Sequence, residues 1–156
     1  REEYPSLRFR GPGRRLPSNG VERMKRGDLD GILELDRRFF GAPRERMLKR
    51  VLHDFTGLCF VARVDGRVTG YIMAKVGEGV YRIGPWICEP DEPEIAQGLL
   101  RRLMRAGVPG INGASVKILR ESGFEGMPSS LRMCYGECKQ MGDPIGIFGI
   151  GAPDKG

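Results

Sequence analysis

The sequence has few of the residues that build metal sites and disulfide frameworks. His53 is its single histidine, and there are four cysteines among 156 residues. Cys134 and Cys138 have C-x3-C spacing, but no second pair of this kind accompanies them and His53 is distant in sequence. Cys59 and Cys88 lie inside apolar segments, where a free thiol behaves as a small apolar side chain. We therefore expect reduced, buried thiols and no metal ion.

Long apolar runs are also absent. No run approaches the ~18 residues that a membrane span requires, and the opening segment REEYPSLRFR lacks the apolar core of a signal peptide. We therefore expect a cytoplasmic protein with no membrane partner. The 40% of apolar residues is enough for a hydrophobic core. The length fits one domain, because domains commonly hold about 100–200 residues.

Positive charge is in excess, with a formal net charge of +6 at pH 7. Much of it falls at the start of the chain and on the first expected helices: Arg1, Arg8, Arg10, Arg14, Arg15, Arg37, Arg38, Arg44, Arg46, Lys49 and Arg50. Such a surface can attract RNA, an acidic partner or the phosphates of a nucleotide-like cofactor, or it can be a plain solvated face. The basic part lacks interleaved aromatic residues and any recognised nucleic-acid motif, so nucleic-acid binding is not favoured.

Residues 1–20 are rich in Arg, Gly and Pro and show no helical or strand periodicity. We interpret them as a tail or linker, compatible with an upstream domain, and place one domain at residues 21–156. This domain opens with a short strand over Val21–Lys25. Two amphipathic helices follow, one capped by Asp28 and ending near Phe40, and one after Gly41-Ala42-Pro43. Their apolar positions are Leu29, Ile32, Leu33, Leu35 and Phe39, then Met47, Leu48, Val51, Leu52 and Phe55.

Alternating apolar residues predict a β-hairpin over residues 58–76, with its turn at Asp65-Gly66. A third strand is expected at Val80–Cys88, where Gly84-Pro85 predicts a bulge or splay because proline cannot donate a ladder hydrogen bond. A helix over 94–105 and a short apolar piece at 106–108 come next, and two strands at 131–135 and 145–150 close the pattern. Few residues remain for the piece after the helix, so either that strand is a stub or residues are absent between Arg101 and Arg105.

The most informative stretch is NGASVKILRESGF, from Asn112 to Phe124. It predicts a helix that ends at Gly123, a residue suited to a left-handed C-cap. This unit and the order of elements around it resemble the Gcn5-related N-acetyltransferase (GNAT) family over roughly residues 21–151. Further residues that carry the resemblance are Gly84-Pro85-Trp86, Pro109 to Asn112 and Leu131-Arg132-Met133.

The resemblance implies an α/β fold with a mixed, mostly antiparallel central sheet flanked by helices. In this family the fourth strand splays from the fifth, and the acyl-pantetheine arm of acetyl-CoA, the co-substrate, slots between them. The cofactor-binding residues that the resemblance implies here are Trp86, Ile87, Cys88, Ile95, Ala96, Gln97, Gly98 and Asn112. The Asn112 amide could bind the cofactor or an ordered water, or it could cap the following helix.

Two positions depart from the family pattern. The pyrophosphate motif, Arg/Gln-x-x-Gly-x-Gly/Ala, aligns with Asp91, Glu94 and Ala96, of which only Ala96 conforms. Carboxylates stabilise a helix N-terminus through its dipole, but they repel a diphosphate at the same amides. Leu119 stands where many members have the tyrosine that protonates the departing thiolate.

The general base is not fixed by the sequence, and its candidate, Glu89, has two interpretations. Glu89 follows the central strand, where its carboxylate could deprotonate an amine directly or through water, or it is a solvated residue at a strand end. We carry Glu89 and Asn112 as the candidate catalytic residues. His53 lies beside Asp54 on a helix face, where a surface imidazole is the commoner reading.

The favoured function is an acyl-CoA-dependent N-acyltransferase, with acetyl-CoA as donor and an amine of unspecified class as acceptor. The first alternative is a catalytically degenerate binding domain on the same fold, which the acidic loop and Leu119 support. The second is a basic RNA-binding module. An upstream tandem domain or a homodimer is compatible with the sequence.

Overall fold

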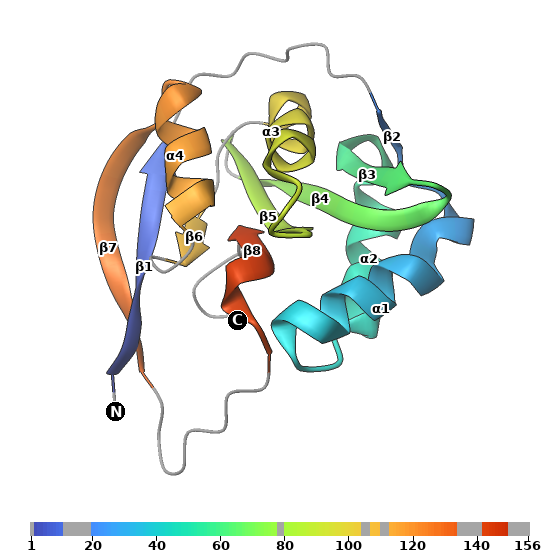
Figure 1. The fold of residues 1–156 in the computed structure, drawn as a ribbon, viewed down its shortest axis with the longest axis horizontal. Helices are drawn as coiled ribbons and strands as arrows, with labels where there is room; N and C mark the ends of the chain where they lie inside the picture. The colour runs from blue at the N-terminus through green and yellow to red at the C-terminus, as the bar shows by residue number, and fades with distance from the viewer. Residues whose placement is uncertain are drawn as a thin grey trace.

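The computed structural model describes residues 2–10, 20–77, 80–103, 107–109, 113–133 and 142–149. These residues form two β-sheets with helices on both sides of the larger one (Figure 1). The larger sheet has the strand order β2-β3-β4-β5-β8, and all its neighbouring strands are antiparallel. The smaller sheet has the order β6-β1-β7, also antiparallel. This arrangement confirms the expected α/β fold.

The first part of the domain follows the predicted order. Its elements are β2 (Val21–Arg23), α1 (Leu29–Phe40), α2 (Glu45–Asp54), β3 (Cys59–Val64) and β4 (Arg67–Gly77). Helix α1 ends because Gly41, with φ of 80°, adopts the left-handed conformation of a C-cap. The hairpin turn is also as predicted, since Asp65 and Gly66 both have positive φ, which a type I′ turn requires.

Strand β5 (Val80–Cys88) carries the predicted bulge. Ile83 pairs with Ala74 of β4, and Trp86 pairs with Ile72, so Gly84 and Pro85 together stand opposite one residue. The chain bends there because Pro85 has no N–H to donate. After it come α3 (Pro93–Arg102), β6 (Gly107–Pro109), α4 (Gly113–Glu121), β7 (Glu125–Met133) and β8 (Ile147–Gly149).

Two boundaries differ clearly from the prediction, and the short strand after α3 matches one of its two alternatives. Helix α3 ends at Arg102 rather than residue 105, because Leu103 turns extended. Strand β7 begins at Glu125, immediately after the α4 C-cap region, and not at residue 131. Strand β6 has three residues, so the fifth strand of the family is a stub in the described residues.

The prediction of an irregular segment over residues 1–20 is wrong for its first half. Glu2–Arg10 form strand β1, which lies between β6 and β7 and pairs antiparallel with both. The register against β7 shifts on either side of Pro5-Ser6. Because Pro5 lacks an N–H, an irregular ladder there is expected. Residues 11–19 lie outside the described part of the chain.

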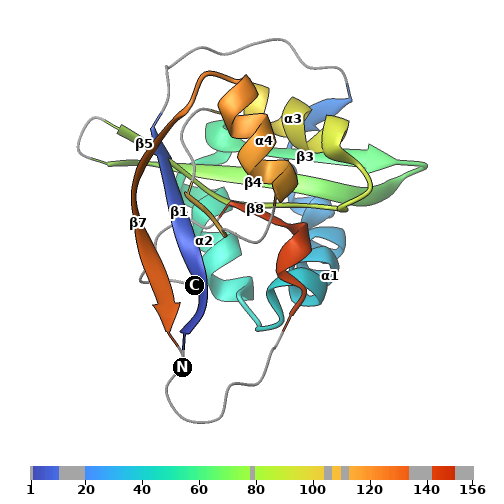
Figure 2. The same cartoon turned by 60° about the vertical axis from the view of Figure 1, so that its left-hand side comes forward.

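Two hydrophobic cores lie on the two faces of the larger sheet (Figure 2). Helices α3 and α4 cover one face and α1 and α2 the other. Successive strand residues point to opposite faces, so Trp86 and Cys88 belong to the α3/α4 core and Ile87 to the α1/α2 core. Of the central apolar residues on β5, Ile87 therefore packs with Tyr71 and Leu48, and Trp86 with Leu99 and Phe148.

Candidate functional site

The predicted cofactor residues of β5 are brought together at the end of that strand. The side chains of Trp86, Ile87 and Cys88 are fully buried in the two cores. A ligand could therefore reach this segment only through the strand's backbone edge. One edge of β5 is taken by β4, so the other edge decides what the site can bind.

Strand β8 occupies that second edge. Trp86 pairs with Gly149 and Ile87 with Ile147, and β8 also lies beside β6 (Figure 1). The fourth and fifth strands of the family pattern, β5 and β6, thus belong to separate sheets, with β8 at the opening between them. The β8 pairing stops at Ile87, so no described strand partner covers the outer edge at Cys88.

Strand β8 is built into both cores. Phe148 is fully buried and its ring centroid lies 5.3 Å from that of Trp86, while Ile147 packs in the opposite core. Before it, Gly146 lies so close to Phe39 that an added Cβ would be 2.2 Å from the Phe39 ring. Burying side chains of this size contributes roughly 1.5–3 kcal/mol each. The strand is therefore part of the folded core and not a loosely held cover.

Trp86 carries an unsatisfied donor inside the α3/α4 core. Its indole Nε1 is buried and has no hydrogen-bond partner, and in the described residues Thr69 Oγ1 is the other such side-chain atom. An unpaired buried polar group costs about 1–3 kcal/mol. Because the Trp86 side chain is fully buried in the α3/α4 core, this donor is not presented to a ligand at the backbone edge.

The start of α3 supplies the second half of the predicted site. Glu92 is the N-cap residue and makes no side-chain capping bond, and the first intrahelical bond runs from Ala96 N to the Glu92 carbonyl at 3.1 Å. The backbone amides before Ala96 are therefore open to an anion. Ala96 and Gly98 are buried, whereas Ile95 and Gln97 are half-buried.

The charges at the start of α3 oppose an anion. Asp91 and Glu94 are exposed and Glu92 is half-buried within the same turn. The nearest helical cations, Arg101 and Arg102, are in the last turn. At 1.5 Å per residue, Glu94 and Arg101 are about 10 Å apart along the axis. These cations do not neutralise the acidic turn.

Glu89 lies at the end of β5 facing α1. Its carboxylate forms ion pairs with Arg38 of α1 and with Arg67 of β4, the latter at 3.7 Å, and its side chain is 17% exposed. Its backbone N–H donates to the Thr69 carbonyl at 2.8 Å. Proton transfer from an amine to Glu89 would take place beside two guanidinium groups. Its catalytic role stays a prediction.

The other predicted or suggested catalytic residues are placed less favourably. Asn112 lies outside the described residues, immediately before α4. Leu119 is fully buried, so the family's tyrosine position faces the core. His53 is exposed at the end of α2, with Nδ1 2.9 Å from the Asp54 carboxylate. Neither role proposed for Asn112 is tested.

The prediction of buried thiols is confirmed for two of the four cysteines. Cys59 and Cys88 are both free and buried. Burial raises the pKa of Cys59 to about 12. Burial, followed by the nearby carboxylates of Glu92 and Glu89, raises the pKa of Cys88 well above its usual value. Cys88 is therefore a poor proton donor at neutral pH. Cys134 and Cys138 lie outside the described residues.

Sequence reasoning missed a buried ionic group between α1 and β4. Asp36 is almost fully buried, accepts a hydrogen bond from the Tyr71 hydroxyl, and receives Arg44 Nε at 3.1 Å. Burial, and next the Asp36 charge, raise the pKa of Tyr71 well above its usual value. The sequence does carry a signal for this buried group, because Asp36 falls four residues after Ile32 and therefore on the apolar face of α1.

No group of three or more His, Cys, Asp or Glu side chains in the described residues is arranged to hold a metal ion. None of the helices in the described ranges is long and apolar enough to cross a membrane.

Solved structures share this fold. One from Pyrococcus horikoshii, named as a candidate acetyltransferase, matches the whole chain with a TM-score of 0.79 at 21% identity. A GNAT-family acetyltransferase from Colwellia psychrerythraea (TM-score 0.62, 14% identity) and a GCN5-related N-acetyltransferase from Sphaerobacter thermophilus (TM-score 0.60, 17% identity) each match over 84% of it. The chain spans about half the length of these proteins: 53%, 55% and 51%, respectively.

No curated protein matches the sequence. A family model described as an acetyltransferase (GNAT) domain does match it, over residues 32–149. That range runs from α1 to β8 and includes the β5 edge, the start of α3 and α4. Because the match covers well over half of the sequence, the chain belongs to the GNAT acetyltransferase family.

Proposed function

We propose that this domain transfers an acetyl group from acetyl-CoA to an amine. The observation that carries the proposal is the family match across the β5–α3 corner, where the backbone edge of β5 beyond the β8 pairing and the uncapped amides of α3 lie at consecutive elements. Acetyl-CoA, when bound, supplies an acyl group already activated as a thioester. The amides before Ala96 hold its phosphates, and the β5 edge near Cys88 holds its pantetheine arm.

Glu89 is the proposed base for the acceptor. An amine is protonated at neutral pH and must lose a proton before it can attack a carbonyl. Glu89 is the partly exposed carboxylate at the end of β5, so it can take this proton directly or through one water. Arg38 and Arg67 then hold the side chain in place.

The test is amine-dependent release of the CoA thiol. The protein is incubated with acetyl-CoA and, in separate reactions, spermidine, an aminoglycoside and a lysine-containing peptide. We expect release with at least one amine and a strong loss of rate in Glu89→Gln, with binding of acetyl-CoA retained. Glu34→Gln is the matched control, because it makes the same carboxylate-to-carboxamide change at an exposed position of α1. Binding of acetyl-CoA without release for any amine would contradict the proposed transfer to an amine.

A specific observation favours a second candidate, a GNAT-fold domain that has lost catalysis. Strand β8 pairs with β5 at two of the three residues where the cofactor arm is expected, and Leu119 is buried where a proton donor is common in the family. Such a domain would bind a ligand or partner without reacting. Absence of any acetyl-CoA binding would favour it. RNA binding, the third candidate, stays a prediction that the slope of affinity against salt would test.

A further inference from the structure

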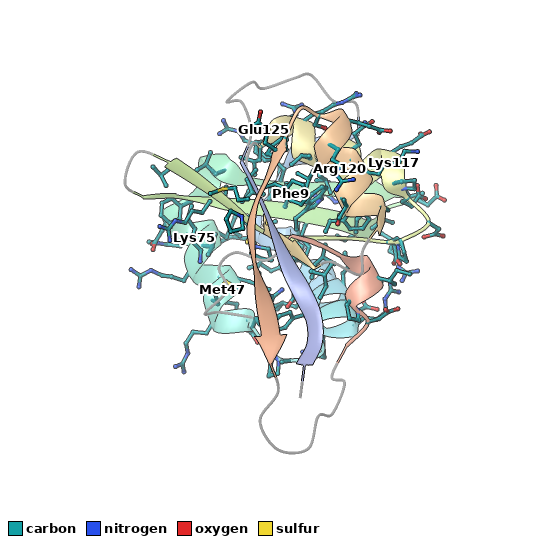
Figure 3. All side chains as sticks on the ribbon, turned by 90° about the vertical axis from the view of Figure 1, so that its left-hand side faces the viewer. Phe9, Met47, Lys75, Lys117, Arg120 and Glu125 are labelled. Carbon is teal, nitrogen blue, oxygen red and sulfur yellow. The ribbon has the colours of Figure 1, made fainter. Side chains whose placement is uncertain are left out.

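A broad groove opens on the α1/α2 side of the domain, away from the β5–α3 corner. It is formed by the connection from β2 to α1, the connection from α1 to α2, and one face of α2, and its volume is about 1300 Å³. No residue of β5, α3 or β8 lines it. Met47, which lines the groove, is labelled in Figure 3 on the opposite side of the sheet from Lys117 and Arg120 of α4. We call it the basic groove.

The floor of the basic groove is apolar. It consists of Met24, Leu29, Met47 and Leu52. Met24 and Leu52 are buried in the core, whereas Leu29 and Met47 are half-buried and packed against it. Methionine side chains are flexible and polarizable, which suits surfaces that adapt to apolar partners of different shape. The floor can therefore take apolar side chains of a bound segment.

The rim of the basic groove is cationic. Six Lys and Arg residues line it and no carboxylate does. Arg44 is committed to the buried Asp36, and Lys49 and Arg50 pair with Glu45 and Asp54 at its margin. The remaining three, Lys25, Arg26 and Arg46, are exposed and have no ion-pair partner in the described residues. The rim thus keeps uncompensated positive charge beside an apolar floor.

We propose that the basic groove binds an acidic, amphipathic peptide segment of a partner protein. Small-molecule pockets usually have about 300–1,000 Å³, so the groove is larger than a single small ligand needs. A peptide that carries apolar residues on one face and carboxylates beside them matches both the floor and the rim. An anionic membrane matches the charge but not the shape. Membrane-binding surfaces insert protruding apolar residues, whereas Met24 and Leu52 lie at the bottom of a concavity.

The test uses two pools of fluorescent 12-residue peptides in which apolar residues recur at helical spacing. One pool carries Glu and Asp at the other positions, and the second carries Lys. We expect the acidic pool to bind and the lysine pool to bind at least ~10-fold more weakly, since rim charges attract one and repel the other. Vesicles containing anionic phosphatidylserine, offered separately, test the membrane alternative.

Two charge reversals locate the site. Lys25→Glu and Arg46→Glu should each lower the affinity for the acidic pool about 10-fold, because each substitution turns an attraction between charges at a few ångströms into a repulsion. Arg120→Glu makes the same charge change on α4, which does not line the groove, and should change binding less than ~2-fold. Melting curves of all three variants verify folding.

Each of three results would overturn the proposal. They are equal binding of both peptide pools, an equal loss of acidic-peptide affinity in Arg46→Glu and Arg120→Glu, and binding to the vesicles but to neither peptide pool. The acetyl-CoA site plays no part in these outcomes, so they are independent of the proposed function.

Discussion

Asp36 is a charged side chain that α1 carries into the apolar layer against β4. A buried carboxylate is stable only when its charge is paired and its oxygens are hydrogen-bonded. Tyr71 and Arg44 supply these contacts, and the Arg44 guanidinium also stacks on the Phe40 ring at 3.4 Å. The group therefore ties the α1–α2 connection to the centre of the larger sheet.

Arg44→Met should destabilise the protein strongly. It leaves Asp36 buried without its counter-charge, and breaking such a pair from one side costs about 3–5 kcal/mol. Tyr71→Phe removes one hydrogen bond to a charged acceptor, for which about 1.5–3 kcal/mol is typical. Urea unfolding measures both changes, with the exposed Arg46→Met as control. An Arg44→Met protein as stable as Arg46→Met would refute the role of the pair.

Cys59 makes stability sensitive to alkaline pH. The unfolded thiol ionises near pH 8.5, whereas the folded thiol keeps its proton until about pH 12. Between these values the unfolded state binds fewer protons, so stability falls as pH rises, by about 1.4 kcal/mol per pH unit for one thiol.

The check is unfolding free energy measured from pH 8 to pH 10 in the parent and in Cys59→Ala. The substitution lowers stability at every pH by creating a cavity, but it should also make the alkaline slope shallower by the share of one thiol, while the buried Cys88 keeps its own share. Parallel slopes in the two proteins would show that this thiol does not carry the linkage.

At the scale of elements, the sequence predicted the helix ends and turns that depend on the backbone preferences of a few neighbouring residues. Gly41 ends α1 and Asp65-Gly66 turns the hairpin through their own backbone preferences, so both were readable from sequence. Strand β1 was not, because Pro5 and the charges around it hide any alternation, and its partners β6 and β7 are about a hundred residues away. Pairing of this kind is non-local.

The same limit applies to the candidate site. The spacing placed Trp86 to Cys88 on a strand and Ala96 at a helix start, as observed. The same spacing could not predict that β8 pairs with that strand, because the residues around Trp86 give no information on which distant segment lies beside them. Asp36 could have been found, since a charge on the apolar face of α1 is visible in the helical pattern.

Phe148→Ala tests whether β8 is part of the core. If it is, the loss of a fully buried aromatic ring beside Trp86 costs about 3–5 kcal/mol. Ile145→Ala, two residues before β8 at a half-exposed position, is the control and should change stability little. A Phe148→Ala protein with the melting temperature of the control would mean that β8 is a dispensable cover over β5.

The whole molecule separates two surfaces of opposite charge. The start of α3 is acidic and lies at the β5 corner, whereas the basic groove lies on the α1/α2 side. Like charges about 4 Å apart repel by about 4 kcal/mol at an effective dielectric near 20. The acidic turn would therefore limit the affinity of the proposed acetyl-CoA site even where the amides of α3 are open.

Isothermal titration with acetyl-CoA tests the central claim most directly, with the parent protein, Glu94→Gly and Glu121→Gly compared. We predict micromolar-range binding at best for the parent (about −8 kcal/mol). Glu94→Gly should bind more tightly because it removes a charge from the first turn of α3, and Glu121→Gly at the end of α4 should match the parent. Tight parental binding that Glu94→Gly leaves unchanged or weakens would contradict the electrostatic argument, and no binding by any of the three would contradict the proposed acyltransferase.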